Sequence, residues 1–417
     1  MISPALLGSV RCPVCLEPEG CARCARPAGG HAACAEYAMR TRCGCGGVEK
    51  VRLDVERGVE SGGLRCPCCG VLYPVNEVGG FADLVPRTNV GEVTQYADHE
   101  FHERLGVTDA PPVLSARVKA DMMLRMLEPE EGSAVLDLGC GAGKFALFAA
   151  SAGARAAGLD VAPFFLDRAT REVDLVLGDL RRLPFGKGSF PRAYSLDVLE
   201  HLHEEGVREV LVEARRTVGP EGRLFVYTHA MESSRIASFQ RAVNRLAKRL
   251  GRAGLIDHER EAMRKSDHKN AIRSHEHFEE MCAAAGLRVA ERRYYNVVFK
   301  AVVEDLLLRL VEQWRRRQRP SAPHGLSDAP DAAADIADIA HPAHREPGSQ
   351  LPSTVGAPPP GRIALAVALG LTWLLKLDVV LFGGIRTGPF FGRLEPSRPA
   401  GGPGATEHRS PPMKILG

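Results

Sequence analysis

The middle of the chain alternates short apolar runs with segments in which apolar residues recur every three or four positions. Short apolar runs are typical of buried strands, and the longer spacing is typical of helices. We expect strands at 134–138, 154–159, 173–177, 193–196 and 223–227, with a helix at 145–152 after the first. Strands separated by helix-length segments predict βαβ units. The expected fold is therefore α/β, Rossmann-like, with helices on both faces of a mostly parallel sheet.

Changes in composition divide the chain into five parts. A Cys- and Gly-rich head covers 1–86, and the alternating region covers 87–319. Residues 320–361 are rich in Pro, Ala, Asp and Ser and hold few large apolar side chains, so we expect a disordered linker there. An apolar helix and a strand are expected within 362–396, followed by a disordered tail at 397–417.

Charge and the first residues limit the partners and the compartment. The 54 basic residues nearly cancel the 51 acidic ones, which leaves a net charge of +3 and no overall field that would attract nucleic acid. The start of the chain has no charged segment followed by a long apolar one, so no secretory signal is expected and the predicted compartment is the cytoplasm.

The run 134–144, AVLDLGCGAGK, predicts a ligand loop between a buried strand and a helix. Gly139, Gly141 and Gly143 remove every second side chain, which lets the backbone approach a ligand at the helix N-terminus. A dinucleotide fingerprint would need its third glycine at position 144, which is Lys144. Asp137 suits a ligand with an ammonium group, such as the methionine end of S-adenosylmethionine. A tight turn in another nucleotide-binding protein is the simpler alternative.

Four motifs follow one another over residues 133–228: VLDLGCGAGKF, GLDVA, GDLRRLPFGKGSF and SLDVLEHL. In this order they resemble the motifs of class I S-adenosylmethionine-dependent methyltransferases of the type 11-like group. The resemblance implies that Asp137 and the three glycines hold the amino-acid moiety, that Asp160 accepts hydrogen bonds from the ribose hydroxyls and that Asp179 receives the adenine amino group. The remaining cofactor contacts that it implies are Cys140, Val161 and the backbone of Leu180. The chain departs from the family at Pro191-Arg192, where an Asp is usual, and at the turn VGPEGRL.

Ten of the 12 cysteines lie in the head, mostly as close pairs. Such pairs suit tetrahedral zinc, because each tight knuckle presents two thiolates to the metal. The stretch CxxCGxxYPV followed by GGFADLVP resembles the Trm112-like zinc modules that accompany methyltransferases. We expect one zinc site at Cys43, Cys45, Cys66 and Cys69, and a second at Cys12, Cys15, Cys21 and Cys24, with Cys34 or His31 as substitutes. Free or oxidised thiols and an iron–sulfur cluster are the alternatives.

Two histidines are candidates for a general base, because they follow strands four and five, where such sheets bind ligands. They are His201, in DVLEHLHEE, and His229. A packed or capping role is the alternative for His201, and methyl transfer can proceed by proximity and orientation alone. Four further histidines gather in the segment where related enzymes build acceptor pockets: His258, His268, His275 and His277.

Two basic helices and one apolar segment point to a surface role. Residues 233–252 form an amphipathic pattern with a basic side, and a second helix at 301–313 precedes Trp314 and Arg315–Arg317. The apolar run 363–375 is too short to span a membrane, and we expect a lid or a helix lying on an anionic membrane, with a buried core helix as the alternative. Residues 388–394 are expected to form the last strand.

The sequence thus predicts an S-adenosylmethionine-dependent methyltransferase that acts on a small-molecule or lipid-like acceptor and also binds zinc. An rRNA methyltransferase with a zinc module is one alternative. Against it, the charge of the head is mixed and its aromatic residues are few, whereas RNA readers need positive charge and aromatic side chains for base stacking. A non-catalytic scaffold that binds S-adenosylmethionine is the other.

Overall fold

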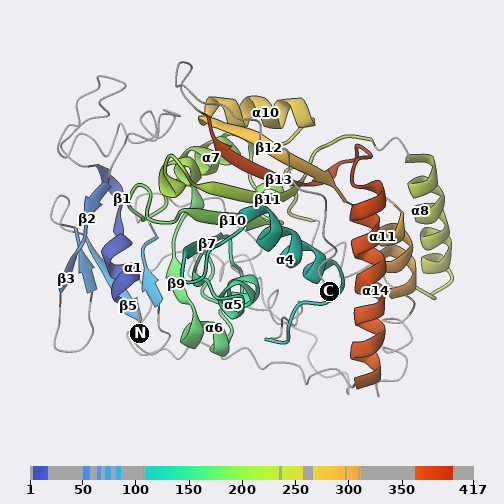
Figure 1. Ribbon diagram of the computed structural model, residues 1–417, viewed down its shortest axis with the longest axis horizontal. Coiled ribbons are helices and arrows are strands. Elements are labelled where there is room, and N and C mark those ends of the chain that lie inside the picture. The colour runs from blue at the N-terminus through green and yellow to red at the C-terminus, as the bar shows by residue number, and fades with distance from the viewer. Residues whose placement is uncertain are drawn as a thin grey trace, which may run out of the picture.

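A single large sheet organises the molecule. The computed structural model describes residues 3–16, 50–56, 63–66, 71–76, 81–85, 107, 109–233, 237–256, 266–295, 298–308, 310 and 362–397. Within these residues an 11-stranded sheet has the order β12-β13-β11-β10-β7-β8-β9-β6-β5-β4-β3, and helices cover both of its faces (Figure 1). The α/β Rossmann-like fold expected from the sequence is therefore confirmed.

Five parallel strands form the centre of this sheet. β7 lies between β8 and β10, β9 continues from β8, and β11 continues from β10. All five agree with the predicted strands to within two residues. Their bounds are β7 Ala134–Leu138, β8 Arg155–Asp160, β9 Asp174–Leu177, β10 Arg192–Leu196 and β11 Arg223–His229.

Two antiparallel strands complete one edge. β12 (Leu287–Tyr294) and β13 (Pro389–Pro396) pair with each other, and β13 also pairs with β11. The last strand that the sequence predicts, 388–394, is thus confirmed as β13. It inserts between β11 and β12, which come much earlier in the chain. Residues 389–396 are therefore part of the central fold.

At the other edge the head joins the same sheet. β6 pairs in parallel with β9, and β5, β4 and β3 continue outward in antiparallel pairs. The Ser3 backbone and hydroxyl both donate to the Asp174 carboxylate, and Val10 bridges to Phe185. Backbone hydrogen bonds therefore make the described strands β3–β6 of the head continuous with the central sheet, and the domain boundary at residue 86 stays a prediction. The elements of the head are α1 Pro4–Ser9, β1 Arg11–Leu16, β2 Lys50–Arg52, β3 Asp54–Glu56, β4 Gly63–Arg65, β5 Leu72–Asn76 and β6 Phe81–Asp83.

The core has two halves, one on each face of the sheet. Side chains alternate between the faces along each strand. On β11, Leu224 and Val226 join one buried cluster, while Phe225 and Tyr227 join the other. Strands buried on both sides read as continuous apolar runs, which is why the sequence shows them without a polar alternation.

Helices and helical turns cover the two faces. The helix predicted at 145–152 is confirmed as α5, and the amphipathic helix at 233–252 is confirmed as α8. The helix predicted at 301–313 is instead a short α-helix, α11, followed by a π-helical segment, η4. The bounds are α4 Leu114–Leu127, α5 Lys144–Ser151, α6 Asp167–Glu172, η2 Leu180–Arg182, η3 Leu199–His201, α7 Glu204–Val218, α8 Ala237–Arg252, α10 His275–Ala284, α11 Phe299–Val302 and η4 Val303–Leu308.

The apolar segment near the C-terminus forms one continuous helix, α14 (Arg362–Phe382). It continues past Lys376 and Asp378, where the sequence predicts that the apolar run ends, because both side chains have partners within the protein. Among the described helices, none has the length and apolarity of a membrane span.

A buried ion pair fixes α7 against the sheet edge that carries the head. Arg216 pairs with Glu213 at 3.0 Å, and both side chains are almost fully buried. The Arg216 guanidinium also donates to the carbonyls of Leu183 and Phe185. Charges buried this deeply are tolerated only when they are fully paired, so Arg216 ties α7 to the segment on which α1 and β1 rest.

The departures from the family pattern have a structural explanation. Arg192 opens β10, and its guanidinium donates to the Leu127 carbonyl at the C-terminal end of α4. The carbonyl of Pro191 accepts a hydrogen bond from Arg223 at the start of β11. Arg192 therefore fastens α4 to the sheet. It does so at the start of β10, away from the carboxyl ends of the parallel strands.

Candidate functional site

Parallel strands place their carboxyl ends at one edge of a sheet, and ligands bind beyond that edge in open α/β folds. The residues that follow the five central strands therefore meet in one region. They are the loop 139–143 after β7, Asp160 at the end of β8, Asp179 after β9, Asp197 after β10 and His229 at the end of β11. Every sequence-predicted cofactor residue lies on or next to these strand ends.

The three glycines of the loop have different surroundings, although all have positive φ. A Cβ on Gly139 would lie 2.5 Å from Val198 Cγ2, and one on Gly143 would lie 2.7 Å from Ala169 Cβ. A Cβ on Gly141 would meet no heavy atom within 4 Å. Gly139 and Gly143 are therefore required by packing, whereas Gly141 faces open space that a ligand can fill.

Most loop N–H groups are already bonded within the protein. Gly139 and Cys140 donate to the Leu159 carbonyl, and Gly143 donates to the Cys140 carbonyl. Gly141 differs, because its N–H donates to Asp160 Oδ2 at 2.7 Å. The cradle is thus held rigid by β8, and the contact between Gly141 and Asp160 marks the place where loop and strand end face the same space.

Asp137 is buried, with 2 % of its surface exposed, and its Oδ2 has no hydrogen-bond partner among the described residues. Burial raises the pKa of the Asp137 carboxyl well above its usual range; the neighbouring Tyr194 hydroxyl lowers it and Asp160 raises it further. A buried acceptor without a partner is costly unless a ligand satisfies it. A ligand cation would lower this cost, because it favours the ionised form.

Asp160 and Val161 form the next strand end. Asp160 Oδ1 accepts from the Ala162 backbone at 3.0 Å, so both carboxylate oxygens are oriented by main-chain donors. Val161 is 45 % exposed, which leaves an apolar surface beside the carboxylate. A carboxylate for hydroxyl groups next to an apolar surface for a flat ring suits the ribose and base of a nucleoside.

Asp179 has the partner Arg181. The carboxylate accepts from the Arg181 backbone at 2.9 Å and from its guanidinium at 2.8 Å, and it caps η2. Leu180 follows within η2 and is partly buried. The predicted contact of Asp179 with adenine stays a prediction, and it requires the adenine amino group to share the carboxylate with Arg181.

A charged cluster surrounds Asp197, which the sequence analysis did not single out. Asp197 has a φ of 55°, which is unusual for a residue other than glycine, and its carboxylate accepts from Lys119 of α4. Desolvation opposes ionisation, but Lys119, His229 and Lys300 outweigh it and hold the pKa of Asp197 below its usual range. Strained backbone of this kind occurs preferentially at functional sites.

His229 forms a hydrogen bond with a buried glutamate. Its Nδ1 lies 3.2 Å from Glu200 Oε1, while Glu200 Oε2 accepts from the Thr228 hydroxyl at 2.9 Å. The Glu200 side chain is 2 % exposed and that of His229 is 33 % exposed. A carboxylate on one ring nitrogen sets the tautomer and orients the ring, which leaves Nε2 as the nitrogen available for a proton from a substrate.

The other predicted base lies beside His229 but is more enclosed. The His201 ring packs against the edge of His268 at 4.8 Å between centroids, and His268 lies 6.2 Å from His229. His201 Nδ1 is 3.9 Å from Asp267, and its side chain is 11 % exposed. It is in a 3-10 turn, η3, where the sequence suggested a longer helix.

Of the three further histidines that the structure describes, His268 joins this region and the other two do not. His275 is buried, its Nε2 donates to the Thr387 carbonyl at 2.8 Å, and burial lowers its pKa. His277 Nε2 lies 3.2 Å from Oε1 of Glu204, the first residue of α7. His258 lies outside the described residues.

Most of the predicted metal ligands cannot be placed. Cys21, Cys24, Cys43, Cys45 and Cys69 lie outside the described residues, and the side chain of Cys15 does too. The side chains of Cys12 and Cys66 are described, and both are fully buried. Within the described part of the chain, no group of three or more His, Cys, Asp or Glu side chains could hold a metal ion.

Sequence reasoning missed Glu200, Asp197 and Lys119. Glu200 adjoins His201 in the motif SLDVLEHL, but its partner is His229, which is 29 positions away. Lys119 comes from a helix before the first central strand. A signal for Asp197 and Glu200 was present in the sequence, because both lie within a few residues of the end of β10. Lys119 had no such signal.

The comparison with protein families agrees with this geometry. Residues 135–222 match the model of a methyltransferase domain. This segment contains β7 to the turn before β11, and it includes the glycine loop, Asp160, Asp179 and Asp197. The chain contains a methyltransferase domain.

Two curated relatives share part of the sequence. An uncharacterized 37.1 kDa protein in transposon Tn4556 of Streptomyces fradiae is 34 % identical over 131 residues, which is 29 % of this chain and 36 % of that protein. An uncharacterized methyltransferase of Synechocystis is 32 % identical over 102 residues, which is 24 % of this chain and 48 % of that protein. The chain thus spans between about a third and a half of the length of these relatives.

Among solved structures, phosphoethanolamine N-methyltransferase 2 of Haemonchus contortus, in complex with S-adenosyl-L-methionine, is similar at 16 % identity with a TM-score of 0.39. The similarity covers 74 % of this chain and 61 % of that one.

The different surroundings of Gly139 and Gly141 lead to a paired prediction for the methyltransferase domain. Gly139→Ala should destabilise the fold by about 1–3 kcal/mol, because the new methyl overlaps Val198 at a positive φ. Gly141→Ala should cost about 1 kcal/mol from its φ alone. The Gly141→Ala variant should nevertheless bind S-adenosylmethionine at least tenfold more weakly, because the new methyl group enters the open space. Denaturant unfolding and calorimetric titration measure the two effects, and undiminished affinity in Gly141→Ala would contradict the assignment of the loop.

The burial of Asp137 predicts opposite effects on stability and binding. Because its pKa is raised in the folded protein, its contribution to stability is present at low pH and is lost as the pH rises through the raised pKa. Asp137→Asn should therefore raise the free energy of unfolding near neutral pH. The same variant should bind S-adenosylmethionine about ten- to a hundredfold more weakly, because it loses a charge-assisted hydrogen bond to the ligand.

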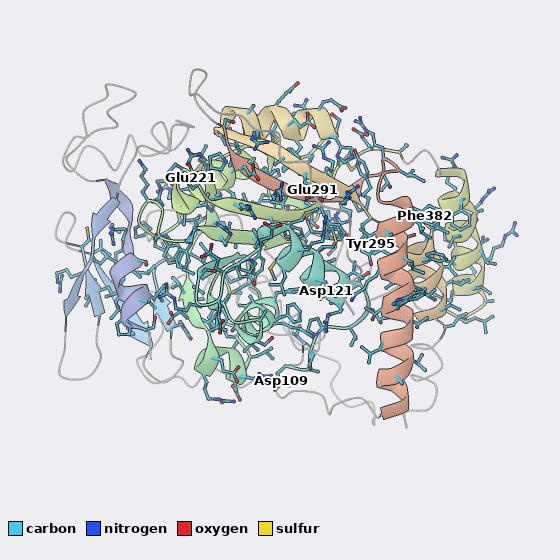
Figure 2. All side chains as sticks on the ribbon, in the orientation of Figure 1. Asp109, Asp121, Glu221, Glu291, Tyr295 and Phe382 are labelled. Atoms are coloured by element: carbon cyan, nitrogen blue, oxygen red, sulfur yellow. The ribbon has the colours of Figure 1, made fainter. Side chains whose placement is uncertain are left out.

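Unfolding at two pH values and calorimetric titration test this prediction. Glu221→Gln, at an exposed position labelled in Figure 2, is the control and should change neither property. An Asn variant that is less stable than the native protein at neutral pH, or that binds the cofactor equally well, would show that Asp137 has another role.

Proposed function

We propose that this protein is an S-adenosylmethionine-dependent methyltransferase that acts on a small-molecule or lipid-like acceptor carrying a hydroxyl or amine. One observation carries the proposal: the open side of the glycine loop shares its sheet edge with the pair formed by His229 and Glu200. A cofactor cradle and an oriented base at the same edge of the sheet are the two parts that methylation of a protonated nucleophile requires.

The residues at the ends of β7 and β8 fit the cofactor. Asp137 offers a buried carboxyl oxygen without a partner, Gly141 faces open space, and Asp160 lies beside the exposed Val161. These residues would hold the amino-acid moiety and the nucleoside. Bound S-adenosylmethionine would supply an electrophilic methyl carbon on a sulfonium, for in-line attack by the acceptor with S-adenosylhomocysteine as the leaving group.

His229 would remove the proton of the acceptor. Glu200 is the positioning residue, because it holds His229 Nδ1 and is itself held by Thr228. As the acceptor loses its proton, the imidazolium is stabilised by the buried carboxylate next to it. A general base of this kind contributes about 10²- to 10⁴-fold to the rate. Asp197 follows β10, the strand between the glycine loop and His229, and it forms an ion pair with Lys119 beside the ring of Tyr227.

Transfer of labelled methyl groups tests the proposal. The purified protein is incubated with labelled S-adenosylmethionine and with lipid, small-molecule or RNA fractions of the source cell. We expect label in a lipid or small-molecule fraction. His229→Gln should lower the rate by about 10²-fold or more, and Glu200→Gln should lower it less, because the Gln amide still reaches the ring.

The control is His203→Gln, which changes an exposed histidine at the N-cap of α7. It should retain the native rate. Label in the RNA fraction alone would favour an rRNA methyltransferase. Cofactor binding without label in any fraction would favour a scaffold, and an unchanged rate in His229→Gln would remove this residue from the reaction.

We also propose that the head binds zinc. Cys12 and Cys66 are both fully buried beside β5: Cys12 Sγ lies 3.5 Å from the Tyr73 hydroxyl, and the Cys66 backbone donates to the Val71 carbonyl just before that strand. This common burial favours one site that combines the pairs Cys12–Cys15 and Cys66–Cys69, in place of the two separate sites expected from the sequence. Zinc would hold the edge strands of the head together, since such small modules fold with their metal.

Elemental analysis of the purified full-length protein tests this proposal. We expect about one zinc per chain and loss of most of it in a variant with both Cys12→Ser and Cys66→Ser. Cys282→Ser is the matched control, because Cys282 is also fully buried but lies within α10, outside the head. Undiminished zinc in the double variant would exclude these ligands, and iron in place of zinc would indicate a cluster.

A further inference from the structure

The helix α14 has its polar and apolar faces inverted. Among its residues with described side chains, the exposed ones are all apolar: Ala366, Val367, Leu369, Gly370, Trp373, Val380 and Leu381. Trp373 is 53 % exposed and Leu381 is 61 % exposed. A helix on the surface of a water-soluble protein normally turns its charged side chains outward, so this face needs another explanation.

Those polar residues of α14 whose side chains are described point into the protein. Lys376 pairs with Asp121 of α4 at 2.9 Å. Asp378 is fully buried and accepts from the backbones of Val298 and Phe299 at the start of α11. The Thr372 hydroxyl accepts from the Leu114 backbone at 2.7 Å. Figure 2 shows Asp121 and Tyr295 on the side of α14 that faces the central sheet. These bonds fix the rotation of the helix and keep its apolar side outward.

A basic helix lies at the same end of the molecule. Figure 1 shows α8 and α14 at the end opposite the head strands, with α11 in contact with both. On α8 the exposed basic residues are Arg241, Arg245, Lys248, Arg249 and Arg252. Phe239 and Leu246 are also exposed on this helix, at 39 % and 46 %. We refer to the outward sides of α8 and α14 together as the helical end.

We propose that the helical end is a docking surface for an anionic lipid bilayer. Large apolar side chains, Trp among them, partition into the boundary between headgroups and acyl chains. Basic side chains near such a surface are each attracted to anionic headgroups. Together, the apolar face of α14 and the basic residues of α8 match both layers of the lipid surface.

Other occupants fit this surface less well. The segment 320–361 is rich in Pro, Ala, Asp and Ser, so it offers few large apolar groups to cover Trp373 and its neighbours. A second copy of the chain would bring another basic α8 toward the first, and the like charges repel. This inference extends beyond the proposed methyl transfer, because docking on lipid requires neither cofactor nor acceptor.

Vesicle co-sedimentation of the full-length protein tests the proposal. We expect binding to phosphatidylcholine vesicles that contain phosphatidylglycerol, much weaker binding to pure phosphatidylcholine, and partial release in high salt. Leu369→Glu with Trp373→Glu should lower the partition coefficient at least tenfold. Leu72→Glu, at an exposed apolar position of the head, is the control and should change it little.

Charge reversal tests the basic side separately. Lys248→Glu with Arg249→Glu should weaken binding to anionic vesicles at least tenfold and leave binding to neutral vesicles unchanged. The control, Arg171→Glu with Lys187→Glu, lies outside the helical end and should leave binding to anionic vesicles unchanged. A second readout uses fluorescence, because the chain has 2 tryptophans and Trp314→Phe leaves only Trp373. Its emission should shift to the blue when vesicles are added.

Three outcomes would overturn the proposal. They are equal sedimentation with and without anionic lipid, an unshifted Trp373 emission, and native binding in Leu369→Glu with Trp373→Glu. If that double variant instead converts a dimer into a monomer in sedimentation velocity runs, the surface binds a second copy. Calorimetric binding of S-adenosylmethionine, measured in parallel, separates this result from failure of the proposed function.

Discussion

The close contact between Gly139 and Val198 is the constraint on which the candidate site depends. It allows the loop after β7 to pass directly beside the end of β10, where any side chain at position 139 would overlap Val198. The same loop is fastened to β8 through the Leu159 carbonyl and the Asp160 carboxylate. Three strand ends are thereby held at fixed separation, and the space above Gly141 is the place they leave open.

Charge at this edge is divided between two environments. Asp137 is enclosed and its carboxyl resists ionisation, whereas Asp197 is surrounded by cations and ionises readily. The difference arises from neighbours and not from the strands, since both acids follow similar buried runs. An enclosed acid suits a ligand that brings its own positive charge, while the cluster at Asp197 suits an acceptor whose protons and charge change during reaction.

The two ends of the molecule use the same sheet in different ways. At one edge, β3–β6 extend it by backbone pairing, and the buried Cys12 of β1 packs against Tyr73 of β5. At the other edge, β13 brings α14 against α4 and α11. Asp378 of α14 caps α11, and Lys300 of α11 contributes to the field at Asp197. The helical end and the candidate site are thus joined through one short helix.

The sequence by itself determined the central strands, the glycine loop and the acids next to them. These features are local, because a strand, a turn and an adjacent carboxylate are all encoded within about ten residues of each other. The resemblance to methyltransferases also indicated the last strand, 388–394. The surroundings of single residues were not readable in this way, and Gly139 and Gly141 look equivalent in the sequence although one packs and the other faces open space.

Only the tertiary structure decided which distant residues meet. The pairing of Glu200 with His229, of Lys119 with Asp197 and of Lys376 with Asp121 joins separate elements, and no spacing rule predicts it. For the same reason the sequence ended the apolar helix before Lys376 and Asp378. Charges in an apolar run are costly in isolation, but partners supplied by α4 and α11 offset that cost and let α14 continue to Phe382.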